Sequence, residues 1–164
     1  MTAPRHSIFI SYRRVDSVYA VDQLDERLKL AFGEEAVFRD ASSIGPAAVF
    51  PQSIRDALAV ARVALVVIGP GWLPATTDPK NIHSPRRLDN PDDWVRLELE
   101  TLLTRGEGVS VIPVLLGGAS VPQPADLPAT LQDLPTRNGM TLPPFPNFAD
   151  SLRQLIEAVA KLLN

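Results

Sequence analysis

VALVVIG at residues 63–69 is a nearly continuous run of apolar, mostly β-branched residues closed by a glycine. A strand that is covered on both faces needs apolar residues at every position, and such strands are typical of parallel sheets flanked by helices. The run therefore predicts a central buried strand, and the segments on either side of it are expected to supply the covering helices.

Amphipathic segments do flank this run. Before it, apolar residues recur at helical spacing through 50–61, with Pro51 in the first turn. After it, helical spacing predicts a second helix with Asn90 as its N-cap, Pro91 at its first position and acidic residues in its first turn. The apolar stripe of this second helix is Val95, Leu99, Leu102 and Leu103.

The same reading extends to both ends of the chain. Short apolar runs predict strands at 7–12, 36–38 and 109–116, and a less distinct one near 140–142. Helical spacing predicts a helix that Asp16 or Ser17 caps and Gly33 ends, and a last helix from about Phe148. Of the 16 prolines, five fall in 70–91 and seven in 122–146, which predicts two long loops, whereas Pro113 hints at weak pairing on one side of its strand.

Strands that alternate with helices predict an α/β fold whose parallel sheet carries helices on both faces. Ligands of such sheets bind beyond the carboxyl ends of the strands. The common nucleotide motifs are missing, because the first strand is not followed by a glycine-rich phosphate loop. Gly69-Pro70-Gly71 is interpreted mainly as a turn.

Composition excludes several classes of function. With 16 Lys and Arg against 19 Asp and Glu, the 164-residue chain has a net charge of −3 and no basic excess for nucleic acid or an anionic membrane. It has no cysteine and only His6 and His83, so thiol chemistry is excluded and a metal site is not expected. The chain is expected to be one cytoplasmic domain over 1–164, because no secretory signal or membrane-length apolar run is present.

Tyr12, Arg13 and Arg14 follow the first strand, where a ligand is expected. Two arginines and an aromatic ring could hold a phosphate and stack on a base. The alternative is a solvated start of a helix, with charge partners such as Asp16. Position alone leaves these two interpretations about even.

Trp94 and Glu98 lie one turn apart at the edge of the stripe of the second helix. A half-buried carboxylate beside an aromatic ring, near the mouth of a sheet, could stabilise positive charge or move protons. Spacing alone favours the plainer interpretation, a surface glutamate with Arg96 or Arg105 nearby. Trp72 is either a shelf for a ligand or, as its place after 63–69 favours, a lid on the core.

Taken together, these segments resemble Toll/interleukin-1 receptor (TIR) domains of the bacterial kind. The resemblance rests on HSIFISYRR at 6–14, FRD at 38–40 leading to IGPAAVF at 44–50, VALVVIG, and DWVRLELETLL at 93–103. It implies a flavodoxin-like three-layer fold with about five parallel strands. The loop from Arg39 to Val49 would correspond to the family's gating loop, although Ala47 stands where the family usually has glycine.

The resemblance also implies an activity, since many TIR domains cleave NAD+ at the nicotinamide–ribose bond. Glu98 matches the catalytic glutamate. The candidate substrate-binding residues are Tyr12, Arg13, Arg14, Arg39, Asp40, Trp72 and Trp94. NAD+ would be the substrate and no cofactor or metal is implied, and the expected partners are other TIR domains and a fused or separate sensor domain.

Three hypotheses follow for the function. The leading one is an NAD+-cleaving effector of bacterial antiviral defence, activated by self-association and giving either ADP-ribose or a cyclic product. The second is a non-catalytic adaptor or a mimic of host TIR signalling. The third is an enzyme that transfers glycosyl groups from other nucleosides. Glu98 together with the Tyr-Arg-Arg of 12–14 favours the first.

Overall fold

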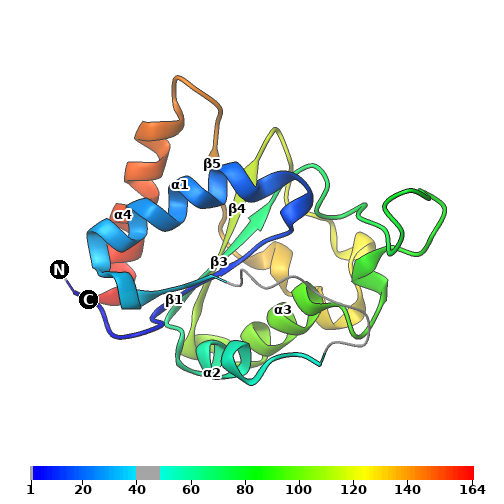
Figure 1. Cartoon of the computed structure of the whole chain (residues 1–164), viewed down its shortest axis with the longest axis horizontal. Coiled ribbons are helices and arrows are strands. Elements are labelled where there is room, and N and C mark those ends of the chain that lie inside the picture. The colour runs from blue at the N-terminus through cyan, green and yellow to red at the C-terminus, as the bar shows by residue number, and fades with distance from the viewer. Residues whose placement is uncertain (1, 40–48) are drawn as a thin grey trace.

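The computed structural model describes residues 2–39 and 49–164, and its centre is a five-stranded parallel sheet (Figure 1). The strand order is β2-β1-β3-β4-β5, so the chain leaves β1 toward one edge and then returns to the other side of it. This is the strand order of flavodoxin-like folds, and the predicted fold class is confirmed. The strands are β1 (Ile8–Ser11), β2 (Val37–Arg39), β3 (Val63–Ile68), β4 (Ser110–Leu116) and β5 (Met140–Leu142).

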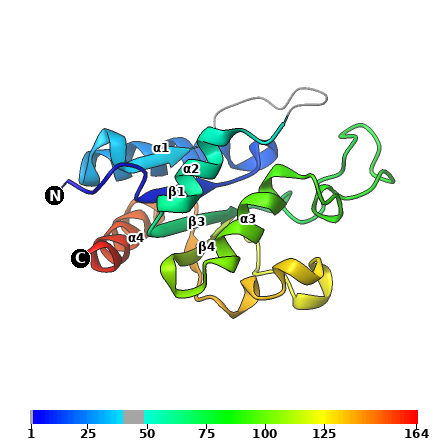
Figure 2. The ribbon, with the colours of Figure 1, turned by 90° about the horizontal axis from the view of Figure 1, so that it is seen from below.

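Among the described residues, four α-helices are present, and Figures 1 and 2 show how they cover the two faces of this sheet. The long helices α1 (Arg14–Phe32) and α4 (Phe148–Leu163) pack on one face, and α2 (Gln52–Val60) and α3 (Trp94–Thr104) pack on the other. Short 3-10 turns between β4 and β5 extend the second layer. Within the described ranges, no helix is both long enough and apolar enough to cross a bilayer.

β3 is the strand that the two layers share. Its odd-numbered residues Val63, Leu65 and Val67 pack under α1 and α4, and its even-numbered residues pack under α2 and α3. All six of its residues are buried, because successive side chains of a strand point to opposite faces and both faces are covered. The central strand predicted from 63–69 is thereby confirmed.

Two predicted helix starts are wrong. The first helix begins at Arg14, before Asp16 and Ser17, so neither of these residues is its N-cap. The helix predicted from Asn90 begins at Trp94 instead, and its cap is Asp93, whose side chain accepts a hydrogen bond from the Arg96 amide. Asn90 instead accepts from the Asp92 amide and makes a turn before the helix.

Pro113 lies inside β4, and its effect on pairing matches the prediction. β4 pairs with β3 from Ser110 to Leu115, but with β5 only from Val114 onward. β5 is preceded by Gly139, where a Cβ atom would lie 3.0 Å from the carbonyl oxygen of Pro113. The proline thus marks the point at which the pairing with β5 begins, and the short strand predicted near 140–142 is confirmed.

Candidate active site

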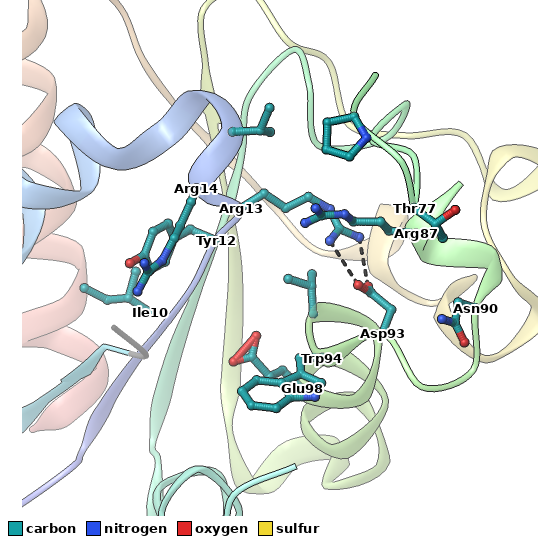
Figure 3. Close-up of a pocket in the computed structure, with 13 residues that line it drawn as sticks. Ile10, Tyr12, Arg13, Arg14, Thr77, Arg87, Asn90, Asp93, Trp94 and Glu98 are labelled. Atoms are coloured by element: carbon teal, nitrogen blue, oxygen red, sulfur yellow. Dashed lines mark hydrogen bonds and ion pairs between the residues drawn. The ribbon is translucent and has the colours of Figure 1, made fainter. Parts of the chain in front are cut away.

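A cleft of about 670 Å³ opens at the carboxyl ends of β1 and β3, where the strand order of the sheet reverses. This is the position at which open α/β sheets bind ligands, and the volume is within the range of small-molecule sites. Three segments form the walls: the residues after β1, the loop between β3 and α3, and the first turns of α3 (Figure 3). The lining residues are Ile10, Tyr12, Arg13, Arg14, Val15, Thr77, Pro79, Arg87, Asn90, Asp93, Trp94, Val95 and Glu98.

Glu98 lines this cleft and is only 3% exposed. Its Oε1 accepts a hydrogen bond of 3.0 Å from the Ser11 hydroxyl at the end of β1. The surface position that spacing favours is therefore wrong, and so are the two arginine partners expected there. Arg96 pairs with Glu100, and Arg105 donates to the carbonyl oxygens of Leu58 and Gly108.

Two aromatic side chains line the same cleft as the catalytic candidate. Tyr12 and Trp94 both line the cleft, and Figure 3 shows the Trp94 ring directly below the Glu98 carboxylate. Trp94 is fixed by an edge-to-face contact with Phe50, with ring centroids 5.8 Å apart. The structure thus places three predicted site residues, Tyr12, Trp94 and Glu98, in the lining of one cleft.

Arg13 also reaches the cleft, but its guanidinium group is bound to the protein itself. It forms a two-pronged salt bridge with Asp93, with distances of 3.1 and 2.8 Å, and its Nε donates to the carbonyl oxygen of Trp72. Both charged side chains are buried. Because Asp93 also caps α3, this pair ties the end of β1 to the start of the helix that carries Glu98.

The four remaining predicted residues each have a different outcome. Arg14 is exposed and lines the cleft. Arg39 lies outside the lining, because it binds Asp22 of α1 at 2.6 Å and donates to the Tyr12 hydroxyl at 3.1 Å. Trp72 is completely buried in the core under α2 and α3, as the lid interpretation has it, whereas Asp40 lies outside the described residues.

The turn after β3 packs against Asp16 of α1. An oxygen of Asp16 accepts a hydrogen bond from the Gly71 amide, so this amide is not available to a phosphate. A Cβ atom at Gly69 would lie only 2.6 Å from the same carboxylate. The glycines of Gly69-Pro70-Gly71 therefore let α1 approach the turn closely, in agreement with their predicted turn role.

Replacing Gly69 by alanine should displace the Asp16 carboxylate from the Gly71 amide and lower the free energy of unfolding by about 1 kcal/mol. Urea unfolding measures it. The combined Gly69→Ala and Asp16→Ala variant should be no less stable than Asp16→Ala alone, because both changes remove the same hydrogen bond between Asp16 and the Gly71 amide. Gly108→Ala is the matched control, since its Cβ would meet nothing closer than 3.8 Å. If the stability losses of Gly69→Ala and Asp16→Ala added up in the combined variant, the two residues would not act through the same hydrogen bond.

Residues 77–90 form the polar wall of the cleft, and sequence reasoning missed them. Thr77, Pro79, Arg87 and Asn90 line it. Arg87 is half-buried and its Nε donates to the carbonyl oxygen of Thr76 at 3.2 Å. The one available signal was that the proline-rich stretch 70–91 directly precedes the helix of Glu98.

The neighbouring Arg86 points elsewhere and fastens this loop. It donates to both carboxylate oxygens of Asp89, at 3.0 and 2.9 Å, and to the carbonyl oxygen of Asp126. The hydrogen bonds from Arg86 hold the pKa of Asp89 below its ordinary value, and those to Asp89 raise the pKa of Arg86. The pair connects the loop to the segment after β4.

This pair makes a testable contribution to stability. A carboxylate with a lowered pKa stabilises the fold above its unfolded pKa, and this stabilisation is lost as pH falls through the folded pKa. Arg86→Ala should raise the pKa of Asp89 toward 3.8 and cost less than about 1 kcal/mol near neutral pH. The cost should shrink below about pH 4. NMR titration of the Asp89 carboxyl group checks it, and an unchanged pKa would refute it.

Within residues 2–39 and 49–164, no three acidic or histidine side chains are placed to hold a metal ion. Asp89 and Asp93 bind arginines, as described above. His6 packs edge-on against Phe38, and His83 is exposed. The structure gives each of these residues a local contact or a solvent-facing position.

Comparison with known proteins gives a consistent result. A family model described as "TIR domain" matches residues 8–156. Comparison with curated protein sequences found no match. The fold resembles the TIR domains in the structure of the activated Roq1 resistosome recognising the pathogen effector XopQ, with a TM-score of 0.63 and 15% identity over 93% of this chain and 98% of that one.

A second similar structure is a metazoan TIR-STING receptor from C. gigas in complex with 2',3'-cGAMP, with a TM-score of 0.56 and 20% identity. The match covers 94% of this chain but 40% of that receptor. At these identities the two likenesses concern the fold.

Proposed function

Because this chain belongs to the TIR domain family, we propose that it is an NAD+ glycohydrolase that cleaves the bond between nicotinamide and ribose. Glu98 is the proposed catalytic residue. Tyr12 and Trp94 are proposed to contact the rings of the substrate, and Arg14 to contact its charged part. NAD+ is the substrate, and the proposal needs no cofactor.

The observation that carries this proposal is the position of Glu98. A glutamate that is almost fully buried at the bottom of a ligand-sized cleft is costly unless it has a partner, and Ser11 supplies one. A carboxylate held in this way keeps a fixed position toward anything that enters the cleft. Buried ionisable groups in clefts cluster at functional sites, which supports a functional role for Glu98.

The chemistry suits a carboxylate without a strong general acid. When the bond between the ribose C1′ and the pyridinium nitrogen breaks, its electron pair goes to that nitrogen and nicotinamide leaves as a neutral molecule. The ribose becomes oxocarbenium-like, and the negative charge of Glu98 stabilises it. Attack by water and loss of a proton gives ADP-ribose, while attack by a group of the same molecule gives a cyclic product.

The test is to incubate the purified chain with NAD+ over a wide range of protein concentrations and to separate the products by chromatography. Nicotinamide should appear together with ADP-ribose or its cyclic form. The rate per molecule should rise with concentration, because the proposal includes activation by self-association. Absence of nicotinamide at every concentration, including conditions that assemble the protein, would contradict the enzymatic function.

The wider setting is part of the same proposal. We place the chain as the effector domain of a cytoplasmic antiviral defence system in bacteria, with residues 1–164 as one TIR domain. A sensor domain, fused or separate, would bring copies together. An adaptor function is the alternative, and it would be favoured if the chain bound other TIR domains but released no nicotinamide. Preferential cleavage of other nucleosides would instead favour a nucleoside glycosyl-transferring enzyme.

A further inference from the structure

Several groups around the cleft that are suited to hold a phosphate already bind the protein itself. The guanidinium group of Arg13 is held by Asp93 and by the carbonyl oxygen of Trp72. The Gly71 amide donates to Asp16, and the Arg96 amide in the first turn of α3 donates to Asp93. The glycine turn after β3 and the Arg96 amide at the N-terminus of α3, groups of the kind that bind anions in α/β folds, are therefore already occupied.

Arg87 differs from these groups. It lines the cleft, and its hydrogen bond to Thr76 uses Nε alone, so both terminal nitrogens of the guanidinium group remain for a ligand. Across the part of the chain that the structure describes, no carboxylate lies within salt-bridge distance of it. Figure 3 shows it reaching into the cleft from the loop, opposite the strand that carries Arg13.

The surroundings of Arg87 also fit a diphosphate better than a ring. Thr77 and Asn90, which can donate hydrogen bonds, line the same loop wall, while the Trp94 ring lies beside Glu98. In NAD+ the diphosphate stands one ribose away from the bond that breaks. A cleft with Glu98 and Trp94 on the helix side, and an arginine with a planar fork of donors on the loop side, matches that order of groups.

We infer that Arg87 binds the diphosphate of the substrate and is the residue that makes the site select a dinucleotide over a nicotinamide nucleoside. This inference rests on the proposed function and adds which residue makes the site specific for a dinucleotide. Arg14 keeps its proposed contact with the charged part of the substrate, and Arg87 takes the diphosphate contact for which Arg13 is unsuited, because the charge of Arg13 is neutralised by Asp93. Arg13 is then a positioning residue that holds the start of α3.

The test measures binding rather than turnover, in a Glu98→Gln background so that no ligand is consumed. Calorimetry measures the binding of two probes: ADP-ribose, which carries the diphosphate, and nicotinamide riboside, which does not. Arg87→Ala should weaken binding of ADP-ribose by on the order of 10- to 100-fold, as expected for lost charge-assisted hydrogen bonds. Binding of nicotinamide riboside should stay within about twofold, and Arg87→Lys should restore part of the loss.

Arg153→Ala is the matched control, because Arg153 is an arginine of α4 that pairs with Asp150 and Glu157 and does not line the cleft. It should leave binding of both probes nearly unchanged. The inference is overturned if Arg87→Ala binds ADP-ribose as the parent does, if it loses both probes equally, if Arg153→Ala shows the same loss, or if the parent does not bind ADP-ribose. A different outcome separates the inference from the proposed function. If the parent chain releases no nicotinamide but Arg87→Ala selectively loses ADP-ribose binding, the proposed reaction is wrong and the diphosphate site at Arg87 is still supported.

Discussion

Replacing Glu98 by glutamine should lower the release of nicotinamide from NAD+ by on the order of 100- to 1000-fold, the usual effect of removing one group that stabilises transition-state charge. Glutamine has nearly the same shape and still offers an oxygen to the Ser11 hydroxyl. The substitution therefore removes the charge and leaves the packing around the site in place. Chromatography of the products over time gives the rate, and circular dichroism checks that the domain remains folded.

Glu100→Gln is the matched control for this experiment. Glu100 lies on the same helix, two residues further on, and its carboxylate binds Arg96 outside the cleft. Its replacement should leave the rate within about twofold, because Glu100 does not line the cleft. If the Glu98→Gln protein were folded and kept full activity in a clean preparation, Glu98 would not be the catalytic residue.

The largest expected effect on stability belongs to Asp93. Asp93→Asn should lower the free energy of unfolding by about 3–5 kcal/mol, because the charge of Arg13 would remain buried without a partner. Asparagine keeps an oxygen that can accept from the Arg96 amide, so the loss reports the charge pair and not the helix cap. A change of this size is a large part of the stability of a typical domain. Urea unfolding measures it.

Two further variants make this prediction specific. Asp92→Asn changes the exposed neighbour in the same turn and should have almost no effect. Adding Arg13→Met to Asp93→Asn should recover part of the lost stability, since a buried ion pair can often be replaced by apolar groups. If Asp93→Asn were no less stable than Asp92→Asn, the pair would not hold the start of α3 in the way described.

Most of the fold was predictable because it depends on local patterns. The buried run at 63–69 and the helical spacing that precedes and follows it were enough to predict a parallel sheet with two helical layers. The start of α3 was not predictable in the same way. Asn90, Asp92 and Asp93 are all good caps, and the choice of Asp93 accompanies its contact with Arg13, which is 80 residues away in the chain.

The candidate site was predictable in part, for a similar reason. Its position beyond the first strand follows from the topology, and Glu98, Trp94 and Tyr12 do meet there. Spacing on one helix could not show that Glu98 is buried, because its partner Ser11 comes from β1, 87 residues earlier. It also could not separate Arg13 from Arg87, since the difference between them is only which of the two has a carboxylate beside it.

The double burial of β3 has a consequence for how such chains diverge. On a helix with one solvent-facing side, mutations can accumulate at most positions, but β3 has no such side. Its substitutions are confined to exchanges among apolar residues of similar volume, which cores tolerate well. Relatives can therefore have very low sequence identity while this strand keeps its apolar character. The hydropathy along β3 should accordingly remain recognisable in relatives whose residue identities no longer match.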